Sequence, residues 1–175
     1  IPNPITVTNI GFTNPMSEAA GTVNMDVQIN GVTDHPVTFQ YVVNSGGGIT
    51  IGNTRAFYGT DFVFPGFAAT TGQITIPAFT TGAFTIPVAI INDAIFEGTE
   101  SAVITLIGGP EVSIAGTADT ELVIADNEVQ PTLNFEVAGQ TVEESNTIRS
   151  IVVRYLNASG VEVPVGTDTD ITIST

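Results

Sequence analysis

Acidic side chains gather in two short segments of the chain. Asp93, Glu97 and Glu100 lie close together, and Asp126 and Glu128 end a later predicted strand. Carboxylates at such spacings repel one another unless solvent or a cation lies between them. Ca²⁺ takes roughly six to eight oxygen ligands of this kind. If the strands meet at one end of the fold, these residues could together bind a hard divalent cation.

The chain as a whole is strongly acidic. It carries 18 Asp and Glu residues against three Arg and no Lys, which gives a net charge of −15. One interpretation is a solvated surface that keeps the protein soluble in a salty environment, and the other is a cation site. Either way, this charge repels phosphate backbones and anionic membranes. We therefore expect neither nucleic-acid binding nor direct insertion into a membrane.

The residues needed for catalysis are scarce. The single histidine, His35, precedes Pro36 in a predicted loop and has no evident partner. Without a base beside a nucleophile, acyl-transfer chemistry is not expected. Cysteine is absent, which excludes disulfides, thiolate chemistry and zinc sites built on Cys. We expect a protein that is not an enzyme, with no catalytic residues.

Short alternating segments position the acidic residues. Seven short strand-like runs are separated by turn residues about every ten residues, and several of them, Val23–Ile29 most clearly, alternate apolar and polar side chains, a pattern typical of a β-sandwich. No segment has the 3.6-residue period of an amphipathic helix. The chain is therefore predicted to be all-β, with strands at Ile5–Ile10, Val23–Ile29, Val37–Val43, Gln73–Ile76, Phe84–Ile90, Ala102–Ile107 and Thr120–Ala125.

The middle of the chain predicts a β-hairpin. Gln73–Ile76 runs into Thr80-Thr81-Gly82, and Phe84–Ile90 returns with every second side chain apolar. Pro87 lies on the opposite face of that second strand. Because proline cannot donate to a ladder, it indicates an edge position or a bulge.

A second unit is predicted after the first. Pro131 begins a new alternating segment, Thr132–Phe135, and the spacing of acidic and apolar residues near the start of the chain recurs about 125 residues later. We expect one complete domain over residues 1–129 and an incomplete second repeat over 130–175, completed by further chain or by a neighbouring chain. The matched residues are Glu18, Thr22, Val23 and Val27 with Glu143 or Glu144, Thr147, Ile148 and Val152.

Four segments, taken in order, resemble the signature of Calx-beta domains. They are Met16–Val23, Gly59–Phe62, Asn92–Glu100 and Val123–Glu128, and the resemblance covers residues 1–128, about three quarters of the chain. Members of this family occur in sodium–calcium exchangers, an integrin subunit and large bacterial cell-surface and adhesin repeat proteins. The resemblance implies a seven-stranded, immunoglobulin-like sandwich with Ca²⁺ held by loops at one end.

The same resemblance implies a set of metal ligands. Calcium-sensing relatives are richer in Asp where this chain has Asn92, Ala94 and Asn127, so we expect fewer ions or weaker binding here. The implied ligands are Glu18, Asp61, Asp93, the main-chain carbonyl of Ile95, Glu97, Glu100, Asp126, Asn127 and Glu128.

These observations predict a calcium-binding structural or adhesive repeat of a large extracellular or cell-surface protein, such as a stalk, filament or adhesin. Ca²⁺ would rigidify the loops at one end of each sandwich. The expected partners are neighbouring repeats, other copies in a filament, or an unidentified surface or receptor. The alternatives are a calcium-sensing regulatory domain and an accessory domain of a larger secreted enzyme.

Overall fold

The computed structural model describes residues 5–44, 50, 52–66, 69–135 and 152–163. The chain divides into two compact units. The first comprises Ile1–Asp93 and Gly98–Asp126, and the second comprises Ala94–Glu97 and Asn127–Thr175. None of the described residues forms a helix long and apolar enough to cross a membrane.

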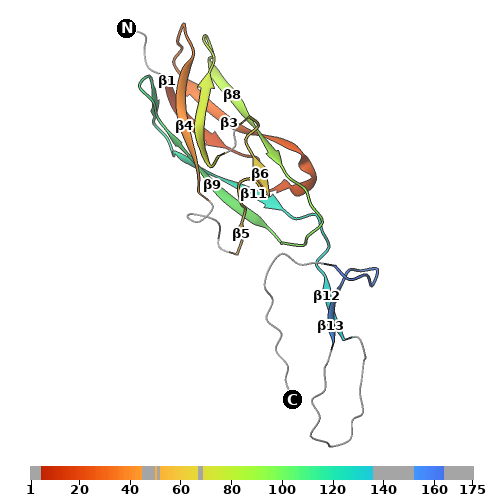
Figure 1. Ribbon diagram of the computed structural model, residues 1–175. Coiled ribbons are helices and arrows are strands. Elements are labelled where there is room, and N and C mark those ends of the chain that lie inside the picture. The colour runs from red at the N-terminus through yellow and green to blue at the C-terminus, as the bar shows by residue number, and fades with distance from the viewer. Residues whose placement is uncertain (1–4, 45–49, 51, 67–68, 136–151, 164–175) are drawn as a thin grey trace, which may run out of the picture. The chain divides into compact units, whose positions relative to one another are not determined.

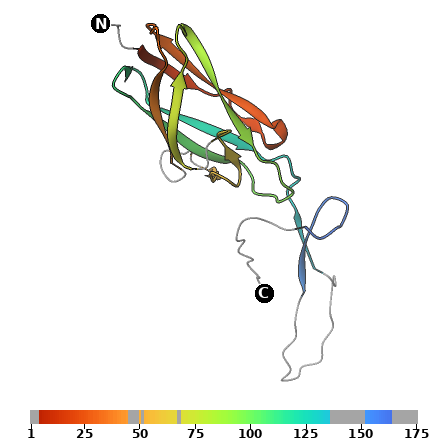
Figure 2. The ribbon, with the colours of Figure 1, turned by 45° about the horizontal axis from the view of Figure 1, so that its top comes forward.

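The first unit is a sandwich of two β-sheets (Figure 1, Figure 2). One sheet contains, in spatial order, β10 (Val112–Ile114), β1 (Ile5–Gly11), β3 (Thr22–Asn30), β8 (Gly82–Ile90) and β6 (Phe62–Val63). The other contains β2 (Met16–Ser17), β11 (Asp119–Ala125), β9 (Glu100–Ile107), β4 (Val37–Asn44) and β7 (Thr71–Ile76), and β5 (Thr54–Arg55) also pairs with β9.

The seven long strands confirm the predicted all-β fold. They are β1, β3, β4, β7, β8, β9 and β11, and each overlaps one of the seven strand-like runs of the sequence. In several of them the apolar and polar residues alternate because successive side chains of a strand point to opposite faces, whereas the central strand β9 is buried on both faces over its first five residues. In β3, every second residue is buried between the sheets and the residues between them face outward. The core is built around large buried side chains that include Phe39, Tyr41, Phe62, Phe64 and Ile104.

The predicted hairpin is wrong. β7 pairs with β4 and β8 pairs with β3, so the two strands belong to different sheets. The connection over residues 77–81 crosses between the sheets, and it contains Phe79 at a φ of 62°. The Phe79 N–H donates to the Thr33 carbonyl at 2.8 Å, which anchors this connection to the loop after β3. The crossing lets both strands turn their apolar faces toward one core.

Pro87, predicted at an edge or a bulge, lies at a local edge within β8, although β8 itself stands between β3 and β6. Pro87 lies across from Asn24 of β3. On the other side of β8, β6 pairs only with Ala89 and Ile90. Among the described strands, the segment of β8 around Pro87 therefore has a neighbour on one side only. A missing N–H costs little there.

Tyr41 fixes β7 against β4. Its ring is buried, and its hydroxyl donates to the Ala69 carbonyl at 3.1 Å. A Cβ on Gly72 would lie 2.6 Å from the Tyr41 ring, so this position in β7 requires glycine. Burial raises the pKa of the Tyr41 hydroxyl. The ring also contacts Phe64, with the ring centres 4.6 Å apart.

The second unit contains the antiparallel pair β12 (Thr132–Phe135) and β13 (Val153–Leu156). β12 confirms the strand predicted after Pro131. After β13, Asn157 Oδ1 accepts the N–H groups of Ser159 and Val161, both at 3.0 Å, and closes a turn. The predicted counterparts Glu143, Glu144, Thr147 and Ile148 lie outside the described residues, so the repeat and its domain boundary stay predictions.

Candidate metal centre

Asp61 is held in a tight turn before β6. Its N–H donates to the Phe57 carbonyl at 3.0 Å, and the Phe57 N–H donates back to Asp61 Oδ2. The Tyr58 and Phe62 rings meet edge to face at 5.6 Å and fasten this turn to the core. Only 6% of Asp61 is exposed. The turn therefore places a buried carboxylate at a fixed position.

Glu18 connects two loops that are far apart in sequence. It begins the 3₁₀ turn η1 (Glu18–Ala20), which Ser17 caps by accepting the Ala19 N–H at 3.3 Å. Glu18 is 8% exposed, and its Oε1 accepts the Asp93 N–H at 2.8 Å. The loop before β3 is thereby joined to the loop after β8.

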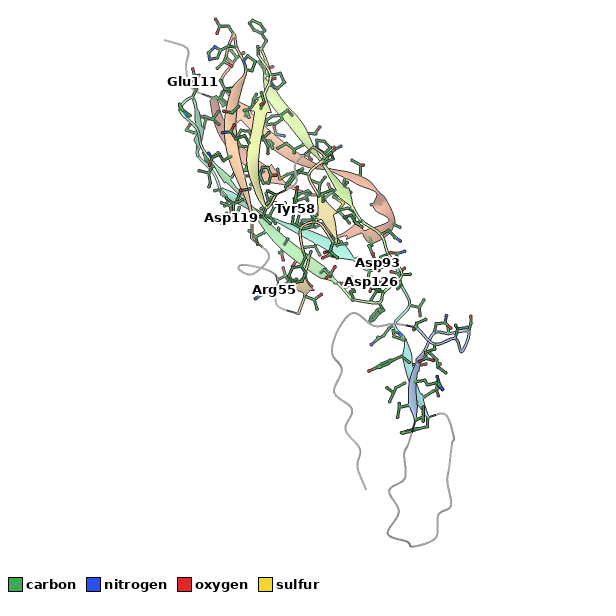
Figure 3. All side chains as sticks on the ribbon, in the orientation of Figure 1. Arg55, Tyr58, Asp93, Glu111, Asp119 and Asp126 are labelled. Atoms are coloured by element: carbon green, nitrogen blue, oxygen red, sulfur yellow. The ribbon has the colours of Figure 1, made fainter. Side chains whose placement is uncertain are left out.

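Glu100 and Asp126 come together through strand pairing. Glu100 is the first residue of β9, and Asp126 directly follows β11. Because the two strands are antiparallel, the start of β9 lies beside the end of β11, with Ile124 opposite Glu100. Asp126 Oδ2 accepts the Gly98 N–H at 2.7 Å. Figure 3 shows Asp93 and Asp126 at one end of the first unit and Glu111 toward the other.

The first unit thus brings five of the predicted ligands together. An oxygen of Glu18 and one of Asp126 lie within 4.8 Å of each other, and the same holds for Asp61 and Glu100. Burial raises the pKa of the Asp61 carboxyl, and the charges of Asp93 and Glu18 act in the same direction. The hydrogen bond from the Phe57 N–H partly opposes this shift.

The other predicted ligands belong to the second unit. Ile95 and Glu97 lie in its segment Ala94–Glu97, and Asn127 and Glu128 begin its longer segment. Along the chain, Glu97 immediately precedes Gly98, and Glu128 follows Asp126 by two residues. Their role as ligands stays a prediction.

The donor set fits a calcium ion. Glu18, Asp61 and Glu100 are buried carboxylates, and burying like charges near one another is unfavourable without a compensating charge. Residues 1–126 contain one arginine, Arg55, and no lysine. The donors are all oxygens, which suit Ca²⁺ rather than the softer metals that favour Cys and His.

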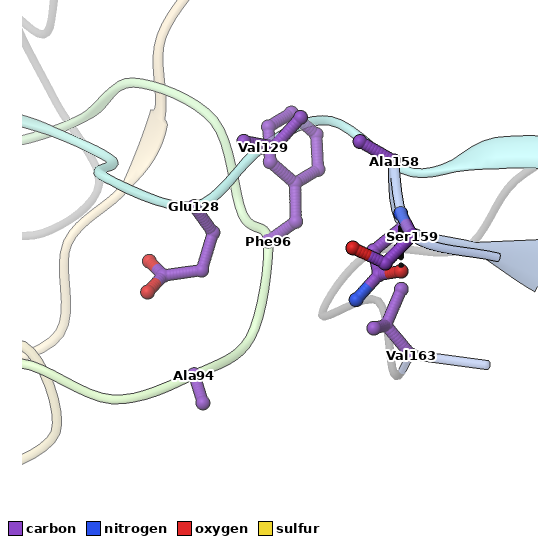
Figure 4. A pocket seen from close by; sticks show the side chains of 8 residues that line it. Ala94, Phe96, Glu128, Val129, Ala158, Ser159 and Val163 are labelled. Atoms are coloured by element: carbon purple, nitrogen blue, oxygen red, sulfur yellow. Dashed lines mark hydrogen bonds between the residues drawn. The ribbon is translucent and has the colours of Figure 1, made fainter. Parts of the chain in front are cut away.

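A hollow of about 340 Å³ lies in the second unit (Figure 4). The side chains of Ala94, Phe96, Val129 and Val163 make much of its wall apolar, and the Glu128 carboxylate adds a polar group. Asn157, Ala158 and Ser159 complete the lining. With one charged group among largely apolar walls, this hollow does not form a second cluster of carboxylates.

The fold gives His35 two partners that were not evident in the sequence. Its Nδ1 lies 2.7 Å from Asp34 Oδ1, and its Nε2 lies 3.0 Å from Glu111 Oε2. Both ring nitrogens therefore face carboxylates rather than a hydroxyl that the ring could activate. The neighbouring Asp34 could have been noticed in the sequence. Glu111 is 76 residues away, and only the fold brings it to the ring.

Comparison with solved structures identifies the architecture. No protein-family model matches the chain, and no curated protein matches it. The crystal structure of the apo form of the Calx CBD1 domain matches with a TM-score of 0.51 and 21% sequence identity, over 71% of this chain and 98% of that one. The chain has the Calx-beta fold.

Two larger Calx structures also match. CBD12 of CALX1.2 has a TM-score of 0.49 and 20% identity over 85% of this chain and 53% of that one. The calcium binding domain CBD12 of CALX1.1 has a TM-score of 0.47 and 20% identity over 67% of this chain and 44% of that one. The chain thus spans about half the length of these two structures or less. The Calx-beta fold also confirms the sandwich that the sequence motifs predicted.

Proposed function

We propose that the chain is a calcium-binding structural module of a large extracellular or cell-surface repeat protein. The observation that carries this proposal is the convergence of Glu18, Asp61, Asp93, Glu100 and Asp126 at one end of the first unit. These residues come from the loops and strand ends of four separate stretches of chain. A cation bound among them ties those stretches together.

Five carboxylates supply part of a calcium coordination shell. Ca²⁺ takes roughly six to eight oxygens and accepts carboxylates, carbonyls and water together. We assign the remaining positions to Glu97, Glu128, Asn127 and the Ile95 carbonyl, which adjoin this end of the unit along the chain. Asn92, Ala94 and Asn127 bring no negative charge to the site. This favours the weak binding, in the approximate range 10⁻⁴ to 10⁻³ M, of extracellular modules over that of a sensor.

Calcium acts in this proposal by ordering loops. Without the ion, repulsion among the carboxylates loosens the segments around Asp93 and Asp126. With the ion, both segments are fixed, and both lead directly into the second unit. The module would thus stiffen a chain of repeats that serves as a stalk, filament or adhesin. Its partners would be neighbouring repeats, other copies, or a surface that the chain adheres to.

Calcium titration calorimetry of the full chain tests the proposal, together with melting curves in calcium and in chelator. We expect saturable binding and a higher melting temperature in calcium. Glu18→Gln combined with Asp126→Asn should abolish both effects. The matched control combines Asp26→Asn with Asp119→Asn, which removes two exposed carboxylates from strands β3 and β11. This control should bind like the original chain.

Two results would overturn the calcium assignment. One is the absence of both heat and a melting shift at about 1 mM calcium, within the range of extracellular modules. The other is an equal loss of binding in the control variant, because calcium binding would then depend on the net charge of the protein and not on a defined site.

A further inference from the structure

The strand at one edge of the larger sheet is unusually long. The terminal strands of the two sheets are β10, β6, β2 and β7, and the first three have only two or three residues each. β7 has six. Very short edge strands protect a protein from pairing with other chains. β7 lacks that protection, and none of the described residues pairs with its outer side.

The backbone of β7 offers a regular set of hydrogen-bonding groups to solvent. The Val43 N–H donates to the Thr70 carbonyl at 2.7 Å. Val43 and Thr70 therefore form a hydrogen-bonded pair. In the register of β4 and β7, such pairs recur at every second residue from Thr70 onward. The N–H and C=O groups of Thr71, Gln73 and Thr75 accordingly point away from β4. No proline interrupts this strand, so each of these residues has both a donor and an acceptor.

This edge is free of charge. Residues 62–92 contain no Asp, Glu, Lys, Arg or His, although the chain has 18 acidic residues. This stretch includes β6, β7 and β8, which lie on one side of the sandwich (Figure 2). Asp26 lies on β3, the strand next to β8, where it is opposite Thr85. Two copies with a net charge of −15 repel each other over most orientations, and this side is where they can approach.

An apolar groove follows the same edge. A hollow of about 530 Å³ lies between β7 and β8, which belong to different sheets. Its lining includes Ile74, Pro77, Phe84, Ile86 and Pro87. The sandwich is therefore open along this side, and a second body placed there would cover apolar side chains as well as backbone groups.

We propose that β7 pairs antiparallel with β7 of a second copy of this chain, around a two-fold axis at Gln73. In this arrangement Gln73 lies opposite its own copy, and Thr71 lies opposite Thr75. These are the three residues whose backbone groups point outward, so each exchanges hydrogen bonds with the residue facing it. The two larger sheets become continuous, and the two grooves come to lie along one seam.

The edge suits its own copy because it is self-complementary. An isologous contact requires each residue to tolerate its two-fold partner. Polar cross-strand pairs of Thr with Thr and Gln with Gln are favourable, whereas like charges directly opposite are destabilising. The outer face of β7 presents Thr71, Gln73 and Thr75, and it carries no charged side chain. The contact does not involve the acidic end, so the dimer forms with or without calcium.

Sedimentation velocity of the full chain from about 10 µM to about 1 mM, in chelator and again in calcium, tests the proposal. We expect a reversible monomer–dimer equilibrium in both conditions. Gln73→Glu and Gln73→Lys each place like charges opposite each other on the axis, so each variant alone should stay monomeric. An equimolar mixture of the two should dimerise again, because opposite charges then face each other.

Gln28→Glu is the matched control. It makes the same change on the outer face of β3, which is paired on both sides, and it should dimerise like the original chain. Monomeric behaviour of the original chain throughout the range overturns the proposal, even if the edge captures an unrelated extended peptide. A dimer that persists unchanged in Gln73→Glu overturns it as well. Melting curves of the variants establish that each is folded.

Discussion

The backbone N–H of Asp93 donates a 2.8 Å hydrogen bond to Oε1 of Glu18, a residue 75 positions earlier in the chain. This bond joins the loop after β8 to the turn before β3. It also places the Glu18 carboxylate among other acidic groups, because a second carboxylate, that of Asp126, lies within 4.8 Å. One side chain thus links two loops and contributes to the charge of the candidate metal centre.

Glu18→Gln should have opposite effects with and without calcium. The amide keeps an oxygen to accept the Asp93 N–H but removes a buried negative charge. In chelator, relief of repulsion should raise the melting temperature by about 2–4 °C, as expected for about 1 kcal/mol in a chain of this size. Calcium affinity should fall at least about tenfold. Melting curves and calorimetry measure the two effects, and destabilisation in chelator would contradict the proposed repulsion.

The pKa of His35 should lie above the ordinary value for histidine. The hydrogen bond to Glu111 raises the pKa of His35 most, and Asp34 acts in the same direction. Because the pKa of this base is higher in the folded state, its stabilising contribution is complete below about pH 6.5 and is lost as the pH rises through the folded-state value. NMR titration of the single imidazole should show a pKa above 6.5, and Glu111→Gln should lower it.

The control for this titration is Asp119→Asn, which removes a carboxylate that accepts a hydrogen bond from Thr105. It should leave the pKa of His35 unchanged. An equal shift in both variants would mean that the ring responds to the net charge of the protein and not to its contact with Glu111.

Gly72→Ala should destabilise the first unit by about 1–3 kcal/mol, the usual cost of overpacking a core. The new methyl group would lie 2.6 Å from the Tyr41 ring, which is buried and fixed by its hydrogen bond to Ala69. Gly11→Ala is the matched control, since nothing lies within 4 Å of its added Cβ. Urea unfolding measures both, and equal effects would contradict the tight contact in the structure.

Phe79→Asn should stabilise the protein by about 0.5–1 kcal/mol. Phe79 is 71% exposed and has a φ of 62°, a conformation that strains most residues and that Asn adopts more readily. Little apolar burial is lost in the exchange. Phe57→Asn, at an exposed position outside the left-handed region, should not stabilise. Urea unfolding compares them, and a loss of stability in Phe79→Asn would mean that the ring makes a contact worth more than the strain.

The strands were predictable because alternation is a local property. In Val23–Ile29 each apolar residue is buried and each polar one is exposed, and the sequence displays this pattern without reference to any other segment. The pairing of strands was less predictable. Gln73–Ile76 and Phe84–Ile90 are separated by a short connection, which favours a hairpin. The fold instead sends β7 to β4 and β8 to β3, a choice that depends on strands far away in sequence.

The metal centre was predictable only in part from the residues themselves. Local spacing indicated a group at Asp93, Glu97 and Glu100 and another at Asp126 and Glu128. The addition of Glu18 and Asp61 came from the resemblance to Calx-beta domains. The structure brings both residues to the same end as Asp93 and Asp126, through one turn held by Phe57 and one hydrogen bond between the turn before β3 and the loop after β8.

The sequence by itself determined the all-β class, the seven long strands and the acidic segments, because hydrophobicity and charge are properties of the individual residues and their local order. The tertiary structure alone decided which sheet each strand joins, that His35 contacts Glu111, and that the uncharged stretch over residues 62–92 includes an open edge. These features depend on contacts between segments far apart in the chain. Such contacts form only when the whole core packs, so no local pattern specifies them.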